Sequence, residues 1–400
     1  MTIPIPGRWN GLANLKRSSP ATIYFVFGPV LLGFLMLACN AQAALFAAPA
    51  ATQPVLNTAA ARTPTQAVLP LDDPASATPP PSPLPLPSAT TLPAPLLHQL
   101  MQDGCCVDPF WSPDGSQVLF LDQPDPGSPA GFWGVSLEGG EPQLYTDRLG
   151  AYSPDMQLLA YPQAGTTIVE RLSDGQRWEI SNGGRAISFS PDGRWIAWTQ
   201  GQSGPPFDTA RREVWISQVD GSQARSLVDL YGGGFSGWFP DGRLLVSGRL
   251  EPQNEQRGIW VVSPEDGALR QIAAGDRLRG FATSPGGTWL AYQETFSPDP
   301  ARNGLWLVNV ESGESRRLDL FGAYQWRDDG HLLIIPLELD VSSHTLWQVE
   351  AATGSAHALT DPIATPFKIA GGDWAVSPDG NHIAFVSAHE HNLWLITLPQ

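Results

Sequence analysis

Short apolar stretches separated by turn-forming sequences recur through the last three quarters of the chain. Residues 118–121 (Val-Leu-Phe-Leu) and 196–198 (Ile-Ala-Trp) are examples, and each follows a segment rich in Pro, Asp and Gly. Apolar runs this short, bounded by turn residues and rich in β-branched and aromatic side chains, are typical of strands rather than helices. The pattern therefore predicts an all-β protein in which short strands alternate with tight turns.

One motif precedes these strands seven times: Ser-Pro-Asp-Gly or a variant of it, which follows an aromatic residue in five of the seven copies. The copies occupy residues 111–115, 152–156, 189–193, 238–242, 283–287, 326–330 and 376–380. Their central positions (114, 155, 192, 241, 286, 329 and 379) are separated by 41, 37, 49, 45, 43 and 50 residues. A period of this length suits one four-stranded blade of a β-propeller.

The chemistry of the motif explains its recurrence without a catalytic role. Pro presets φ for a tight turn, the Asp side chain can accept hydrogen bonds from nearby backbone amides, and Gly relieves the exit. A metal-binding or catalytic role for these aspartates is the alternative, but a catalytic residue is not expected at every turn of a ring. We therefore interpret the motif as structural.

A second strand in six of the seven repeats carries a tryptophan. These residues are Trp133, Trp215, Trp260, Trp306, Trp347 and Trp394. Large aromatic side chains at equivalent positions in a repeat predict packing between blades, because each buries a large apolar area. A ligand cage is the alternative interpretation.

The ends of the chain indicate how the ring closes. The seventh repeat stops after its third strand, near residue 396, whereas residues 98–101 before the first motif resemble 357–360, the outer strand of the sixth repeat. An amino-terminal strand that completes the last blade would remove an unpaired sheet edge. The predicted fold is thus a seven-bladed β-propeller of four-stranded antiparallel blades, closed by an N-terminal outer strand.

The quoted turns and Trp strands resemble the WD40-like propeller repeat of the TolB type over residues 95–400. That resemblance implies the propeller fold. TolB itself resembles a six-bladed propeller behind a separate α/β domain, for which residues 44–95 leave no room, so its partners are not carried over. Similar propellers cap prolyl-oligopeptidase-like peptidases, whose G-x-S-x-G motif is matched here only by 234–238 (Gly-Phe-Ser-Gly-Trp), without the final Gly.

The amino terminus has the layout of an export signal. Arg8, Lys16 and Arg17 precede an apolar run over 21–38, and 36–39 (Met-Leu-Ala-Cys) resembles a bacterial lipobox with Cys39 as the lipidated residue. Two alternatives are signal cleavage after Ala-Gln-Ala at 41–43 and an uncleaved membrane anchor. Residues 44–94 are rich in Ala, Pro and Thr and predict a disordered linker. The expected organisation is a signal or anchor over 1–43, this linker over 44–94 and the propeller over 95–400, in an exported, membrane-anchored protein that is periplasmic or on the cell surface.

Charge narrows the choice of partners. The first 94 residues hold four basic and two acidic residues, which leaves 19 basic and 37 acidic residues for the remainder. A body this acidic repels phosphate backbones, so we expect no nucleic-acid partner. No sequence motif indicates a cofactor.

Candidate site residues lie in the loops of differing length expected on the face opposite the Ser-Pro-Asp-Gly turns, because binding residues often sit on irregular loops held by a rigid scaffold. The binding candidates are Asp208, Arg211, Arg212, Glu294, Glu338 and His389. His344, His389 and His391 are weak metal candidates, since no established ligand spacing supports them, and exposed polar loop residues are the simpler interpretation. Cys105 and Cys106 could form a vicinal disulfide or remain thiols.

Two functions follow as hypotheses. The first is a non-catalytic binding or scaffold module of the cell envelope, tethered to the membrane through its amino terminus and contacting a protein or glycan. The alternative is a propeller enzyme, for instance a carbohydrate lyase or hydrolase, with its site at the channel mouth. Converging His, Asp and Glu residues would favour the enzyme, whereas a flat or apolar loop face would favour the binding module.

Overall fold

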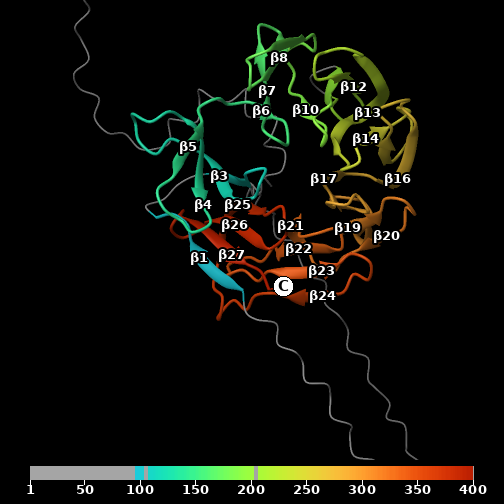
Figure 1. Cartoon of the computed structure of the whole chain (residues 1–400). Coiled ribbons are helices and arrows are strands. Elements are labelled where there is room, and N and C mark those ends of the chain that lie inside the picture. Colours follow the sequence, from blue (N-terminus) through green and yellow to red (C-terminus); the bar gives the residue numbers. More distant parts are fainter. Residues whose placement is uncertain (1–94, 103–106, 202–205, 400) are drawn as a thin grey trace, which may run out of the picture. The chain divides into compact units, whose positions relative to one another are not determined.

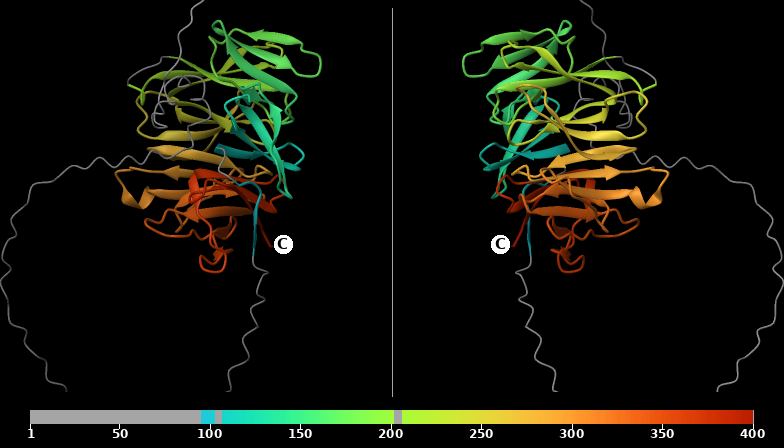
Figure 2. Two further views of the ribbon diagram at one scale, coloured as in Figure 1. Left: turned by 90° about the vertical axis from the view of Figure 1, so that its left-hand side faces the viewer. Right: turned by 90° about the vertical axis from the view of Figure 1, so that its right-hand side faces the viewer.

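The computed structural model describes residues 95–102, 107–201 and 206–399. The signal segment, the linker and the three cysteines (Cys39, Cys105 and Cys106) lie outside these residues. The described part consists of strands, with one short 3-10 helix at Pro300–Arg302. The sheets follow one another around a common centre in sequence order, which gives the propeller-like arrangement in Figures 1 and 2. No helix of the described part is long and apolar enough to cross a bilayer.

The first two repeats each form a four-stranded antiparallel sheet. The sheet of repeat 1 contains β2 (Val107–Trp111), β3 (Gln117–Asp122), β4 (Gly131–Ser136) and β5 (Gln143–Thr146). The sheet of repeat 2 contains β6 (Ala151–Tyr152), β7 (Leu158–Gln163), β8 (Thr166–Arg171) and β9 (Arg177–Ile180). In both, the strands pair in sequence order from the inner to the outer strand.

The last three repeats also form four-stranded sheets. Repeat 5 contains β17 (Leu278–Thr283), β18 (Trp289–Glu294), β19 (Gly304–Asn309) and β20 (Ser315–Arg317). Repeat 6 contains β21 (Gly322–Trp326), β22 (His331–Pro336), β23 (Trp347–Glu350) and β24 (Ala356–Ala358). Repeat 7 contains β25 (Ile369–Val376), β26 (His382–Ser387) and β27 (Leu393–Thr397), and β1 (Leu96–Gln99) is its fourth strand.

Repeats 3 and 4 are joined in one seven-stranded sheet. Its strands are β10 (Ser188–Phe189), β11 (Trp195–Gly201), β12 (Arg211–Gln218), β13 (Arg225–Trp238), β14 (Leu244–Arg249), β15 (Arg257–Val262) and β16 (Leu269–Gly275). The first half of β13 pairs with β12 as the outer strand of repeat 3, and its second half pairs with β14 as the inner strand of repeat 4.

The prediction of seven separate four-stranded blades is therefore wrong in its count. The described residues form five four-stranded blades and one seven-stranded sheet. The cause lies in the glycines of β13, where the register shifts between Tyr231 and Gly234. Gly232 adopts a φ of 68°, and a Cβ on Gly233 would lie 1.8 Å from the Ser247 carbonyl oxygen. Glycine lets the strand bend and approach its neighbour closely, so the backbone continues from one repeat into the next without a separate connection.

The predicted closure by an amino-terminal strand is confirmed. β1 pairs antiparallel with β27, with Leu96 opposite Thr397 and Gln99 opposite Trp394. Immediately after it, Leu100 and Met101 are 3% and 8% exposed and join the core shared by the last and first sheets. The Trp111 indole nitrogen in repeat 1 also donates to the Ala375 carbonyl in repeat 7, at 3.1 Å.

The hydrophobic core is distributed between consecutive repeats. Six buried clusters in the described part join repeats 2 and 3, 3 and 4, 4 and 5, 5 and 6, 6 and 7, and 7 and 1. Each of the six repeated tryptophans packs, partly buried, against one of them, which confirms the packing interpretation. Between repeats 1 and 2, Phe132 meets Tyr152 edge-on at 5.9 Å. Near this junction Arg148 pairs with Glu170 through two hydrogen bonds of 2.9 and 2.8 Å.

The repeated turns are held by their own side chains, as predicted for the aspartate. In the first turn the Asp114 carboxylate accepts hydrogen bonds from the Ser112 hydroxyl at 2.6 Å and from the Ser116 amide at 3.1 Å. The Ser112 hydroxyl in turn accepts the Gln117 amide at 3.0 Å. The same bonds recur around Asp155, Asp192 and Asp379. A buried serine is the centre of five of the seven turns, whereas Phe239 and Arg327 occupy its position in the fourth and sixth; this role of the serine was not among the predictions.

The fifth turn shows how this network survives a missing aspartate. Gly286 replaces the aspartate there, and Asp329 of repeat 6 fills the position from the neighbouring sheet. Its carboxylate accepts from the Ser284 hydroxyl, from the Gly286 amide at 2.9 Å and from the Thr288 hydroxyl at 2.5 Å. A Cβ on Gly286 would lie 2.6 Å from the Asp329 Cγ, so glycine is the residue that leaves room for the substitute. Burial raises the pKa of Asp329, but the hydrogen bonds from Ser284 and Thr288 outweigh this and hold it below its usual range.

This exchange predicts a compensating pair of substitutions. Asp329→Ala should lower the free energy of unfolding by about 1–3 kcal/mol, because it leaves the buried Ser284 hydroxyl without its acceptor. Gly286→Asp alone should also destabilise, because it brings two carboxylates together. The double variant should recover most of the loss, since the carboxylate introduced at position 286 could then accept from Ser284 as in the other repeats. Urea unfolding of the four proteins measures the coupling; additive losses would contradict this account of the turn.

Candidate functional site

The connections of the propeller gather at two ends. Because the strands of each sheet are antiparallel, the turns between first and second strands lie at one end, here called the turn face. The connections between second and third strands lie at the other end, together with the crossings from one repeat to the next; this end is called the loop face. All the binding candidates from the sequence lie at or beside the loop face, but the structure divides them into three separate groups.

The first group surrounds the bend of β13. The Asp208 carboxylate pairs with the Arg257 guanidinium. The backbone carbonyl of Asp208 accepts a hydrogen bond from Arg249 at 2.9 Å. Arg211 pairs with Asp229 at 2.6 Å on the neighbouring strand. Arg212 lies beside it, opposite Leu230 in the β12–β13 register. Asp208 and Arg211 thus already have ionic partners within the protein.

The second group is a buried ion pair in repeat 5. The Glu294 side chain is 1% exposed and accepts two hydrogen bonds from Arg302, at 3.0 and 3.2 Å. The Asp276 amide donates to the same carboxylate at 3.0 Å, and Arg302 also donates to the Ala274 carbonyl at 2.6 Å. These contacts hold the loop between β18 and β19 against the end of β16. The role of Glu294 in this geometry is therefore structural.

The third group joins three segments of repeats 6 and 7, residues 337–346, 359–368 and 388–392, which we call the loop cluster. Glu338, His344, His389 and His391 all lie in it. The His344 amide donates to the Phe367 carbonyl at 2.8 Å, and the Lys368 ammonium donates to the Val341 carbonyl at 2.7 Å. These bonds tie the first two segments together.

The histidines of the loop cluster are separated by their partners. His344 Nδ1 accepts the Ile369 amide at 3.3 Å, and burial, followed by the charge of Lys368, lowers the pKa of His344. His389 Nε2 lies 3.4 Å from the Ser342 carbonyl oxygen, which links the third segment to the first. His391 is exposed. Among the residues that the structure describes, no group of three or more His, Cys, Asp or Glu side chains is placed to hold a metal ion.

Large apolar side chains at the tips of the loops were not among the residues selected from the sequence. Of the large apolar residues exposed in the described part, six lie in loop-face connections, and five of these are more than 60% exposed: Phe207 at 63%, Phe296 at 72%, Leu337 at 70%, Leu339 at 84% and Ile363 at 90%, with Leu149 at 41% as the sixth. Exposed large apolar side chains that gather on one face are a feature of binding surfaces. Leu337-Glu338-Leu339 between two strands was the available signal, because such a loop has no folding need for leucines.

A second missed feature is a pair of acidic residues on neighbouring inner strands. Asp108 on β2 and Asp373 on β25 lie next to each other, and both strands carry a register shift at this point. Burial, and then the negative charge of Asp108, raise the pKa of Asp373, although the Asp108 backbone hydrogen bond opposes the shift. Asp108 adopts a φ of 51°. The contact between Asp108 and Asp373 depends on this local irregularity of the backbone, which the sequence pattern does not predict.

The structure also contains a shallow pocket on the loop face of repeat 4. It has a volume of about 410 Å³ and is lined by Arg249, Asn254, Gln256 and Trp260 among others. The floor is open because Gly248, Gly258 and Ala274 lie side by side on three neighbouring strands. The Trp260 indole nitrogen donates to the Gly248 carbonyl at 3.2 Å, which fixes the ring over this floor.

The fold and these sites define an all-β protein with a propeller-like arrangement of four-stranded sheets. Oligogalacturonate lyase from Vibrio parahaemolyticus has a similar fold, with a TM-score of 0.56 and 14% identity over 78% of this chain and 95% of that one. A second oligogalacturonate lyase structure, in complex with manganese, aligns with a TM-score of 0.53 and 16% identity over the same shares. TolB from Acinetobacter baumannii is also similar, with a TM-score of 0.38 and 14% identity over 63% of this chain and 62% of that one.

Curated proteins resemble parts of the chain. An uncharacterized protein of Agrobacterium fabrum, Atu1656, is 29% identical over 147 residues, which are 34% of this chain and 47% of that protein. Tricorn protease homolog 1 of Streptomyces coelicolor is 26% identical over 180 residues, 41% of this chain and 16% of that protein. The chain thus spans less than half the length of these two relatives. No protein-family model matches it.

Proposed function

We propose that this chain is an exported, membrane-tethered binding module that captures a protein partner through its loop face. The observation that carries the proposal is the exposure of Phe207, Phe296, Leu337, Leu339 and Ile363 at that face. Exposing large apolar side chains to water is unfavourable by about 25 cal/mol for each Å², and a partner that covers them recovers this free energy. Apolar tips on a rigid scaffold favour a protein surface over a glycan, which would require more hydrogen-bonding groups.

The proposal of export is supported by the amino-terminal sequence. Basic residues, an apolar run and Cys39 follow in the order of a lipoprotein signal, and residues 44–94 have the composition of a tether. Replacing Cys39 with Ser should abolish incorporation of a radiolabelled fatty acid and release the protein from the membrane fraction. Labelling that persists in the Cys39→Ser variant would exclude Cys39 as the lipidated residue.

Capture from an envelope extract tests the binding function. A triple variant, Leu337→Ser, Leu339→Ser and Ile363→Ser, should lose partners that the unchanged protein retains, because it removes apolar contact area without touching the core. The matched control is Leu172→Ser with Leu269→Ser, two exposed leucines of the turn face, which should retain them. Equal melting temperatures establish that both variants are folded. If the triple variant kept every partner and the control lost them, the binding surface would lie on the turn face.

A further inference from the structure

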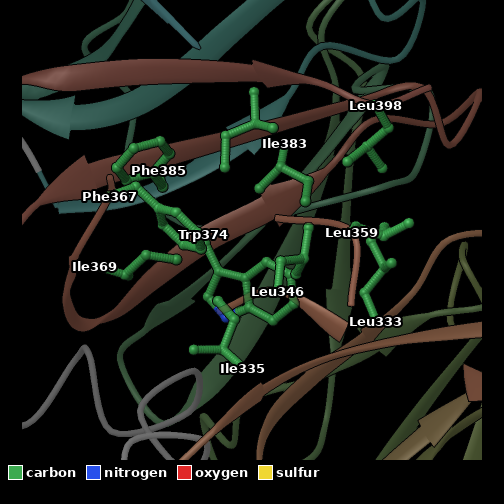
Figure 3. Close-up of a cluster of buried hydrophobic side chains, with 11 residues drawn as sticks. Leu333, Ile335, Leu346, Leu359, Phe367, Ile369, Trp374, Ile383, Phe385 and Leu398 are labelled. Carbon is green, nitrogen blue, oxygen red and sulfur yellow. The ribbon is translucent and has the colours of Figure 1, made fainter. Parts of the chain in front are cut away.

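The loop cluster is anchored on a packed core. Leu346, Leu359 and Phe367 belong to its segments and are 0%, 9% and 5% exposed. Figure 3 shows these side chains directed into one cluster with Trp374 and Phe385 of the last sheet. The Leu346 amide also donates to the Thr360 hydroxyl at 2.8 Å. The first two segments are therefore fixed on the core, and the side chains that they expose are held on a rigid base.

The same segments place apolar tips outward. Leu337 and Leu339 lie directly after β22, and Asp340 beyond them adopts a φ of 59° that turns the chain back. Ile363 lies in a turn whose Asp361 carboxylate accepts the Ile363 and Ala364 amides at 2.8 and 2.9 Å. The most exposed large apolar side chain of the described part is thus held in place by its own turn.

Exposed carboxylates alternate with these tips. Glu338 and Asp340 flank Leu339, Asp361 precedes Ile363 by two residues, and Glu390 lies in the third segment. Against these four carboxylates the loop cluster contains one ammonium group, Lys368, which already donates to the Val341 carbonyl. The backbone amides of Ala364 and Ile363 hold the pKa of Asp361 below its usual range, so this carboxylate stays charged. The cluster is therefore both apolar and acidic.

We propose that the loop cluster binds a basic amphipathic polypeptide segment, whose apolar side chains cover Leu337, Leu339 and Ile363 while its Lys and Arg residues face the surrounding carboxylates. The proposal rests on the proposed binding function and names the chemistry of its partner. Charge complementarity raises the association rate and selects among partners, and apolar contact supplies affinity. An anionic lipid surface is a poorer occupant, because inserting the apolar tips would bring four carboxylates against lipid headgroups.

Defined peptides test the partner's chemistry. The full-length protein in detergent is titrated with a fluorescent 14-residue peptide that has Leu at helical spacing and Lys elsewhere. A Leu/Glu peptide and a Ser/Lys peptide of the same length separate apolar from charge effects. Vesicles of phosphatidylcholine with phosphatidylglycerol test the lipid alternative. We expect binding of the Leu/Lys peptide, and binding at least about tenfold weaker for the other two peptides.

Two sets of substitutions then locate the site. The apolar set is Leu337→Ser, Leu339→Ser and Ile363→Ser; the acidic set is Glu338→Gln, Asp340→Asn, Asp361→Asn and Glu390→Gln; the control set is Glu138→Gln, Glu141→Gln, Glu265→Gln and Glu314→Gln on the turn face. The apolar and acidic sets should each weaken binding of the Leu/Lys peptide at least about tenfold. The control set should stay within about twofold. The acidic set's effect should shrink at about 0.5 M salt, where surface charges are screened.

Each outcome supports or overturns the proposal. Equal weakening by the control set would show non-specific attraction to an acidic protein and overturn it. Binding of vesicles that depends on the apolar set, without peptide binding, would assign the surface to lipid. Absence of binding by the Leu/Lys peptide, while capture of envelope partners still requires Leu337, Leu339 and Ile363, would overturn the proposal of a basic amphipathic partner. That outcome would leave the proposed binding function intact. If the Leu/Lys peptide did not bind and the apolar set also had no effect on envelope partners, the proposed binding function would be overturned as well.

Discussion

Deleting residues 96–101 from the full chain should abolish cooperative folding or lower the melting temperature by more than any single substitution. The deletion removes β1, and with it every backbone pair that β1 makes with the outer edge of β27. It also removes Leu100 and Met101 from the core between the last and first sheets. Loss of two buried side chains costs about 2–5 kcal/mol each, and an unpaired sheet edge invites aggregation.

Circular dichroism during heating, together with light scattering, measures both effects of this deletion. A matched deletion of residues 86–91, in the predicted linker, should leave the melting temperature unchanged. Equal melting temperatures for the two deletions would contradict the closure of the ring by β1.

Trp306→Ala should lower the free energy of unfolding by about 3–5 kcal/mol, through the cavity it leaves in the core between repeats 4 and 5. The indole stacks on Tyr292 with ring centroids 6.5 Å apart, and its nitrogen donates to the Arg302 carbonyl at 2.8 Å. Arg302 in turn holds the buried Glu294, so the loss extends into that ion pair.

The variant Trp306→Phe separates these contributions. It keeps an aromatic ring near Tyr292 and loses the indole donor, so we expect a smaller loss of about 1–2 kcal/mol. Urea denaturation of the two variants provides the measurement. If the alanine and phenylalanine variants lowered the free energy of unfolding by the same small amount, Trp306 would not contribute to core packing. The packing interpretation of the repeated tryptophans would then fail.

The sequence was informative where local physical chemistry repeats. The Ser-Pro-Asp-Gly turns, the Trp strands and the amino-terminal strand could all be found, because each follows from turn geometry, from period or from the need to pair a sheet edge. The separation of repeats 3 and 4 could not be judged, because the glycines at 232–234 are equally compatible with a flexible connection and with a bent strand. Contact with Ser247 across the sheet decides between them.

The candidate site was less accessible from sequence. Selecting charged loop residues led to Glu294, whose carboxylate already accepts hydrogen bonds inside the protein from Arg302 and from the Asp276 amide. Charge in a loop does not reveal whether its partner is internal, since that depends on which loops fold together. The apolar tips at Leu337, Leu339 and Ile363 were visible as sequence, but strand ends and loop tips differ only in exposure, which the fold determines. The substitution of Asp329 for the aspartate missing at Gly286 joins residues 43 positions apart, and no local pattern indicates it.

Hydrogen–deuterium exchange on the protein with and without its captured partner tests the central claim most directly. The account predicts slower exchange in 337–346 and 359–368, with unchanged exchange in the turns at 137–142 and 263–268. Protection confined to those turns, with the loop cluster exchanging as in the free protein, would contradict the assignment of the loop face as the binding surface.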